Sequence, residues 1–240
     1  MTHPSARCQC MESCKEPPLE GEAFCEKHRK GCPRIPPLSG WEPKYEPWRW
    51  NNRKEIRLTH NCFSYAFNIL DVEQVKACLR HPSCDVPFHQ PGSISGYPKF
   101  TDKDPKTCPN MIVRLQGDNP SIIPSSFEHQ CPSGTSKIAL IGDEDEDYHF
   151  LVQNKPENPR DTPYFSQKSG ALPVTDRDAK GHKIYDVELA NHHYKKSSLN
   201  YDRFCGYFCI PRDRPLFVKV GGYNEYKKLN LSRVTRRRRK

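Results

Sequence analysis

The chain has little apolar material for its length. Of its 240 residues only 35% are hydrophobic and three are methionine. No apolar run approaches the about 20 residues that a transmembrane helix requires, so we expect no membrane span. The first seven residues also lack the apolar stretch of a secretory signal peptide, so secretion by that route is not expected. The length suits one domain with a modest core and a small appendage.

The chain is rich in proline and cysteine, with 23 and twelve residues respectively. So many prolines predict a backbone that is largely loop. Cysteines in a chain without a signal peptide indicate metal ligands or redox chemistry first, and disulfides second. The net charge of +9 is concentrated at the end, where Arg236 opens a run of arginines that closes with Lys240. That tail is either a nuclear-targeting or nucleic-acid-binding patch, or a solvated segment without a partner.

The composition divides the chain into four parts. Residues 1–32 form a Cys/His-rich module, and residues 33–58 a connector rich in proline that holds all three tryptophans. Because a solvated linker rarely contains tryptophan, we expect the connector to be extended and packed across the main domain. Residues 59–220 form that domain, and residues 221–240 the basic tail.

The N-terminal module predicts a structural zinc site. Two closely spaced ligand pairs suit tetrahedral coordination, and the segment is too short to fold around a core of its own. Cys8 is an alternative to the first ligand, and Cys32 is left as a spare thiol. The expected ligands are Cys10, Cys14, Cys25 and His28.

The main domain has readable helices and strands. Apolar spacing predicts a helix from residue 62 to about 70, capped by Asn61, which restarts near residue 73 and ends before Pro82. Residues 137–142 and 148–153 predict a hairpin around a charged turn, and residues 164–167 a further short strand. Residues 85–133 contain eight prolines and predict loop, with a weak strand at residues 111–115.

Cys62 has the placement of a nucleophilic thiol. It would begin a helix, where the unpaired N–H groups and the helix dipole favour a thiolate. A base must then lie within hydrogen-bonding reach, and His149 is the best candidate because it would lie on a strand just after a tight turn. Gln167, on the next expected strand, is positioned to orient the imidazole.

Five blocks carry a resemblance to a known family. Residues 61–68 read NCFSYAFN, residues 147–153 DYHFLVQ, residues 165–170 FSQKSG, residues 174–181 VTDRDAKG and residues 204–211 FCGYFCIP. In this order they resemble a group of papain-like or NlpC/P60-like cysteine hydrolases. The Cys/His module resembles the zinc knuckles of proteins from large cytoplasmic DNA viruses, and we therefore expect a viral origin.

The resemblance implies an α+β papain-like fold, in which a helix bearing Cys62 packs on a small antiparallel sheet bearing His149. It also implies acyl transfer, with Cys62 as nucleophile and His149 as base. The family's second histidine is Gln167 here, and Ser169 replaces the proline that follows the lysine. Gln167 would have to orient His149 as a neutral acceptor.

The sequence leaves the bonding state of six cysteines in the main domain undecided. Cys205 and Cys209 form a disulfide, a two-ligand metal clip or, as we favour, a pair of packed thiols. Cys78, Cys84, Cys108 and Cys131 would staple the proline-rich loops if the protein reaches an oxidising place such as a virus particle.

The leading functional hypothesis is a cysteine protease or amidase, acting on protein or peptide substrates in the host cytoplasm or the virion. The alternative is a catalytically inactive papain-like scaffold that serves as a virion component or contacts nucleic acid.

Overall fold

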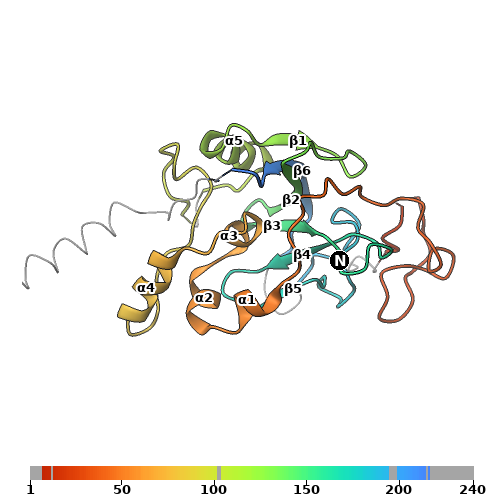
Figure 1. Cartoon of the computed structure of the whole chain (residues 1–240), viewed down its shortest axis with the longest axis horizontal. Coiled ribbons are helices and arrows are strands. Elements are labelled where there is room, and N and C mark those ends of the chain that lie inside the picture. The colour runs from red at the N-terminus through yellow and green to blue at the C-terminus, as the bar shows by residue number, and fades with distance from the viewer. Residues whose placement is uncertain (1–6, 12, 102–103, 195–198, 215, 217–240) are drawn as a thin grey trace, which may run out of the picture.

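The computed structural model is an α+β fold built on one antiparallel sheet of six strands (Figure 1). It describes residues 7–11, 13–101, 104–194, 199–214 and 216. The basic tail, including residues 236–240, lies outside the described residues. Within the described part, none of the helices combines the length and the apolar character that crossing a bilayer requires.

The strand order is β1-β6-β2-β3-β4-β5. Every strand pair is antiparallel, and the central strands β2 and β3 form the expected hairpin. Asp143 pairs with Asp147 across its turn, and Ile141 pairs with His149. The strands are β1 (Ile123–Ser125), β2 (Thr135–Asp143), β3 (Asp147–Asn154), β4 (Tyr164–Lys168), β5 (Val174–Thr175) and β6 (Arg203–Pro211).

In the described part of the chain five helices accompany the sheet, and three of them begin at a side-chain cap. Asn61, Asp71 and Thr107 each accept a backbone N–H from the first turn of α3, α4 and α5 respectively. The helices are α1 (Pro47–Asn51), α2 (Lys54–Thr59), α3 (Cys62–Ala66), α4 (Val72–Arg80) and α5 (Cys108–Asp118). The cap at Asn61 and the restart and end of α4 agree with the sequence analysis.

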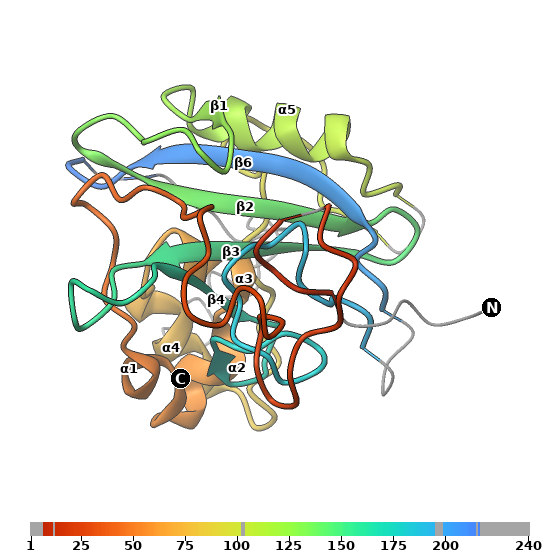
Figure 2. The ribbon, with the colours of Figure 1, turned by 90° about the vertical axis from the view of Figure 1, so that its right-hand side faces the viewer.

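Each face of the sheet supports its own core, because alternate residues of a strand point to opposite faces. Tyr148, Phe150 and Val152 of β3 belong to the larger core beneath α3. Leu151 belongs to a second core on the other face, with Phe165 and partners from residues 184–207. Figure 2 shows the N-terminal segment and the loops after β5 across this second face, while α3 and α4 lie behind the sheet.

Three expected elements are corrected by the structure. The helix that begins at Cys62 ends at Ala66 and not near residue 70. Residues 111–115 are not a strand but part of α5, where Thr107 caps the helix and Pro109 occupies its first turn. The connector is not extended throughout, since α1 and α2 occupy much of its second half. Its first half does pack across the sheet domain, for example where Gln153 donates to the carbonyl of Pro36.

Eight of the twelve cysteines are in disulfides and three belong to the candidate metal group, so the expectation that metal ligands come before disulfides is wrong. Cys205 and Cys209 are neither packed thiols nor a clip, because each is bonded to a cysteine of the proline-rich region. The disulfides are Cys10–Cys32, Cys78–Cys84, Cys108–Cys205 and Cys131–Cys209. The last two tie residues 108 and 131 to β6.

Candidate functional site

Three cysteines and one histidine of the N-terminal module converge on a common centre. Their ligand atoms lie within 4.8 Å of one another. Nδ1 of His28 lies 3.3 Å from Sγ of Cys8 and 3.4 Å from Sγ of Cys25. Sγ of Cys14 lies 3.6 Å from Sγ of Cys25. Together these four side chains could hold a metal ion.

Cys8, the alternative in the sequence analysis, is the first ligand of this group, and Cys10 is not part of it. Cys10 is bonded to Cys32, so neither is available to a metal and Cys32 is not a free thiol. The sequence spacing allowed either cysteine. The disulfide decides between them because it holds the sulfur of Cys10 outside the centre.

The module is anchored on the second face of the sheet domain. Between Cys8 and Cys10, Gln9 is buried, and its side-chain oxygen accepts the backbone N–H of Tyr185 at 2.8 Å. The ring of Phe24 stacks on Tyr185 with 4.7 Å between centroids. Arg34, just beyond the module, pairs with buried Asp186 at 2.8 Å. Residues 185 and 186 are therefore held by contacts with the module and with Arg34.

Cys62 is the first residue of α3 and lies against the backbone of β3 on either side of His149. Its Sγ is 4.0 Å from the carbonyl oxygen of Tyr148, and the backbone N–H of Phe150 also interacts with it. β4 pairs only with residues 151–154 of β3, so Cys62 occupies the edge that β4 leaves open. Cys62 and the His149 backbone are therefore close neighbours.

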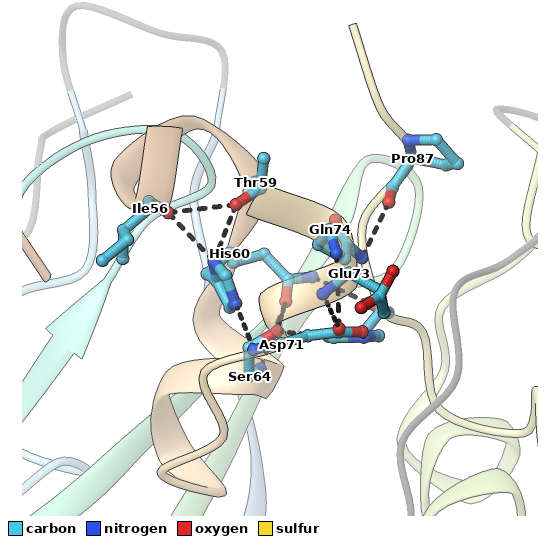
Figure 3. A network of polar contacts seen from close by, with 10 residues as sticks. Ile56, Thr59, His60, Ser64, Asp71, Glu73, Gln74 and Pro87 are labelled. Carbon is cyan, nitrogen blue, oxygen red and sulfur yellow. Dashed lines mark hydrogen bonds and ion pairs between the residues drawn. The ribbon is translucent and has the colours of Figure 1, made fainter. Parts of the chain in front are cut away.

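A buried polar network fixes the segment that carries Cys62 (Figure 3). His60 accepts the backbone N–H of Asp71 at 2.8 Å. The Asp71 carboxylate pairs with Nε2 of His89 at 3.0 Å, and Nδ1 of His89 lies 2.8 Å from the hydroxyl of Ser64. The Asn61 amide donates to the His89 carbonyl at 3.0 Å. These contacts hold both sides of Cys62.

Sequence reasoning missed this network. His89 lies in a region interpreted as loop, and Asp71 was passed over at a helix restart. Only the capping signal of an aspartate before α4 was readable from the sequence. The pairing of Asp71 with a histidine 18 residues further along depends on the tertiary fold.

Gln167 and His149 are brought together as expected. Oε1 of Gln167 lies 2.8 Å from Nε2 of His149. The same amide donates from its own nitrogen to the Arg177 carbonyl at 2.6 Å, which fixes its orientation. Because Oε1 can only accept, Nε2 of His149 must carry the proton. Nδ1 is then the basic nitrogen, and it makes no hydrogen bond within the described part of the chain.

Two tyrosines complete the surroundings of His149. No pattern in the sequence indicated either of them. The ring of Tyr201 stacks on the imidazole with 5.2 Å between centroids. Its hydroxyl donates to Asp147 at 3.0 Å. Tyr194 donates to Oε1 of Gln167 at 3.1 Å. The ring is thus held on its face and at Nε2.

Cys62 and His149 line one pocket of about 220 Å³, together with Asp147, Lys106 and aromatic residues. No hydrogen bond joins Cys62 to His149 among the described residues. Burial raises the pKa of Cys62 to about 12, and the Asp147 charge acts in the same direction. Burial lowers the pKa of His149 to about 3. At neutral pH the resting pair is therefore a thiol and a neutral imidazole.

Comparison of the chain with protein-family models, with curated proteins and with solved structures finds no match.

Proposed function

We propose that this protein is a cysteine-dependent hydrolase of amide or ester bonds with a papain-like site formed by Cys62, His149 and Gln167. The observation that carries the proposal is the orientation of His149. A neutral imidazole with its proton on Nε2, held by a fixed amide, leaves Nδ1 as the basic nitrogen of a residue that lines the same pocket as Cys62. General-base activation of the thiol requires this tautomer, and it also requires that Nδ1 reach the sulfur when substrate binds.

The reaction begins with transfer of the Cys62 thiol proton to Nδ1 of His149. The sulfur bonds to the substrate carbonyl carbon, and the C–N bond breaks as His149 returns the proton to the leaving nitrogen. Water, deprotonated by His149, then hydrolyses the thioester. The two reactive groups rest without a mutual hydrogen bond, and such bonds commonly tighten only when substrate binds.

Zinc is the metal that best suits the N-terminal cluster. Zn–S bonds of about 2.3 Å in tetrahedral geometry separate two sulfur ligands by roughly 3.8 Å. The separation of 3.6 Å between Cys14 and Cys25 is close to that value. Three thiolates and one imidazole form a closed ligand set, so the metal would be structural and would stabilise the module and its contacts with residues 185 and 186.

Labelling with iodoacetamide tests the catalytic pair, with the labelled cysteine identified by peptide mapping. His149→Ala should slow labelling of Cys62 by about 10²-fold, the scale of general-base assistance. His129→Ala is the control, because His129 is exposed and does not line the pocket of Cys62. Equal rates at Cys62 in the wild type and both variants would refute the hydrolase.

A second readout uses p-nitrophenyl acetate as a small acyl donor. The wild type should release one p-nitrophenolate per chain in a burst and carry an acetyl group on Cys62, whereas Cys62→Ser should give no burst.

One observation favours the alternative of an inactive scaffold with a virion or nucleic-acid-associated role. The Cys62 side chain is buried, with the residue only 5% exposed, and its pKa is raised. A thiol that is never activated would behave in this way. Cys62 labelling that stays slow and independent of His149 would support this second function.

A further inference from the structure

Lys168 is a fully buried cation that the proposed mechanism does not use. The residue is 0% exposed and follows Gln167 on β4. Its Nζ donates to three backbone carbonyls, those of Arg57 at 2.8 Å, Gly170 at 2.7 Å and Leu172 at 3.2 Å. An ammonium group has three donors, so this cage satisfies each of them in the charged form.

The alternation of β4 places Lys168 opposite to Gln167 across the strand. Gln167 points to the face of His149, whereas Lys168 reaches the carbonyl of Arg57 in α2 on the face of α3. Gly170, one of the cage carbonyls, lines the pocket together with Cys62. Neighbouring residues of β4 thus contact His149 on one face of the sheet and place a cation on the face of α3, where Cys62 lies.

The charged groups around Cys62 come from β3, β4 and two loops. Asp147 of β3 disfavours a negative sulfur, and Lys168 of β4 favours it. Lys106 and Glu146 lie at the same pocket, with Glu146 exposed to solvent. Around Lys168 itself, Arg57 repels the ammonium and Cys62 attracts it, and the ammonium also disfavours a charged His60 in α2's C-terminal cap. α3 has only five residues, so its dipole contributes little to stabilising a thiolate.

We propose that Lys168 is the electrostatic partner of Cys62, and that its caged ammonium stabilises the thiolate formed when the thiol proton leaves. The proposal rests on the proposed function of Cys62. Lys168 exchanges no proton in the step; the proton moves from Cys62 to His149, and the new negative charge on sulfur is balanced by a cation that is already in place.

Two properties of Lys168 support this role. The cage holds the ammonium in position before the reaction, so no reorganisation is needed when charge develops. Burial lowers the pKa of Lys168 to about 7, and the interaction with Cys62 acts in the opposite direction. Lys168 should therefore stabilise the Cys62 thiolate in acidic and neutral solution, and this stabilisation should weaken as the pH rises above 7 and the ammonium loses its proton.

The test is the pH profile of iodoacetamide labelling at Cys62. Lys168→Gln keeps two donors for the carbonyl cage but removes the charge, and Lys168→Met fills the volume without donors. Either folded variant should label at least about tenfold more slowly than the wild type at pH 6.5, equivalent to a shift of about one pKa unit. The difference in labelling rate between the wild type and each variant should narrow at higher pH.

Lys137→Met is the matched control. Lys137 is also 0% exposed, donates to one carbonyl at 2.6 Å, and lies on β2 four residues before the partner of His149. Its removal should lower stability without changing the labelling profile of Cys62. A Lys168 variant that loses stability but keeps the wild-type profile would show a purely structural role and overturn the proposal.

A second measurement needs no change at Lys168. In His149→Ala, labelling of Cys62 should rise with pH and level off near the pH at which Lys168 loses its proton. A rise that continues unbroken to about pH 9.5 would overturn the role of Lys168. The rate ratio between wild type and His149→Ala tests the hydrolase separately, so failure of one proposal is distinguishable from failure of the other.

Discussion

Oε1 of Gln167 lies 2.8 Å from Nε2 of His149, while the amide nitrogen of Gln167 is occupied by the carbonyl of Arg177. The hydrogen bond to the Arg177 carbonyl fixes the orientation of the amide. With its nitrogen on that carbonyl, the amide presents only its oxygen to the imidazole, so the imidazole must be the donor. A neutral side chain thereby selects the histidine tautomer that a thiol-activating base needs.

Gln167→Leu should therefore abolish the tautomer preference of His149. Leucine keeps most of the volume but accepts no hydrogen bond, so Nε2–H loses its partner. Nitrogen-15 NMR of the imidazole should show a mixture of tautomers in place of a single protonated Nε2, and labelling of Cys62 should slow. Gln167→Glu, whose carboxylate only accepts, should keep the proton on Nε2. An unchanged imidazole spectrum in Gln167→Leu would contradict this relationship.

The metal cluster predicts different outcomes for two neighbouring cysteines. Cys8→Ser should abolish binding of one zinc per chain in elemental analysis, because Cys8 contributes a ligand atom. The double variant Cys10→Ser/Cys32→Ser should keep its zinc, since those sulfurs are bonded to each other. If the double variant loses its zinc and Cys8→Ser keeps it, then Cys10 and not Cys8 is the ligand.

Buried histidines predict acid sensitivity before the carboxylates titrate. Burial lowers the pKa of His149 to about 3 and that of His60 to about 4, whereas unfolded histidine titrates near 6.5. Their contribution to stability is complete above about pH 6.5 and is lost as the pH falls through the folded values. Each contributes a slope of up to about 1.4 kcal/mol per pH unit.

Urea unfolding between about pH 6 and pH 5 measures this slope, above the range of ordinary carboxyl groups. His149→Gln should unfold with a flatter pH dependence than the wild type. The exposed His129 offers a control, since His129→Gln should leave the slope unchanged. A wild type whose stability is constant over this range would contradict the buried, neutral state of both histidines.

Asp71 should stabilise the fold through its charged form. The hydrogen bond from His89 is the main cause that lowers the pKa of Asp71, and burial opposes it. This stabilisation is present above the unfolded pKa of about 3.9 and is lost as the pH falls through the lower folded value.

Asp71→Asn should cost about 1 kcal/mol at neutral pH, a modest figure because the carboxylate is partly exposed. The difference from wild type should shrink below about pH 3. Asp85→Asn, at an exposed position, should change stability little at either pH. If the stability difference between the wild type and Asp71→Asn does not change with pH, Asp71 stabilises the fold through its packing and not through its charge.

Local features of the fold could be predicted from the sequence. Asn61 caps α3 through a hydrogen bond to a residue three positions away, and the β2–β3 hairpin follows from alternation around a charged turn. α5 lies in a region whose many prolines and weak periodicity predict loop, although Thr107 and Pro109 are residue types that favour a helix start.

The sequence by itself determined the residue types of the site: a cysteine at a helix start, a histidine on a strand, a glutamine on the next, and a module of metal-binding residues. Only the tertiary structure decided which of them meet. Cys8 and not Cys10 joins the cluster because Cys32, 22 residues away from Cys10, takes its sulfur. Neighbouring side chains of a strand always alternate, but only the register of β4 against β3 decides that Gln167 faces His149 and Lys168 faces α2. Such pairings depend on contacts between segments far apart in the chain, which spacing along the sequence does not encode.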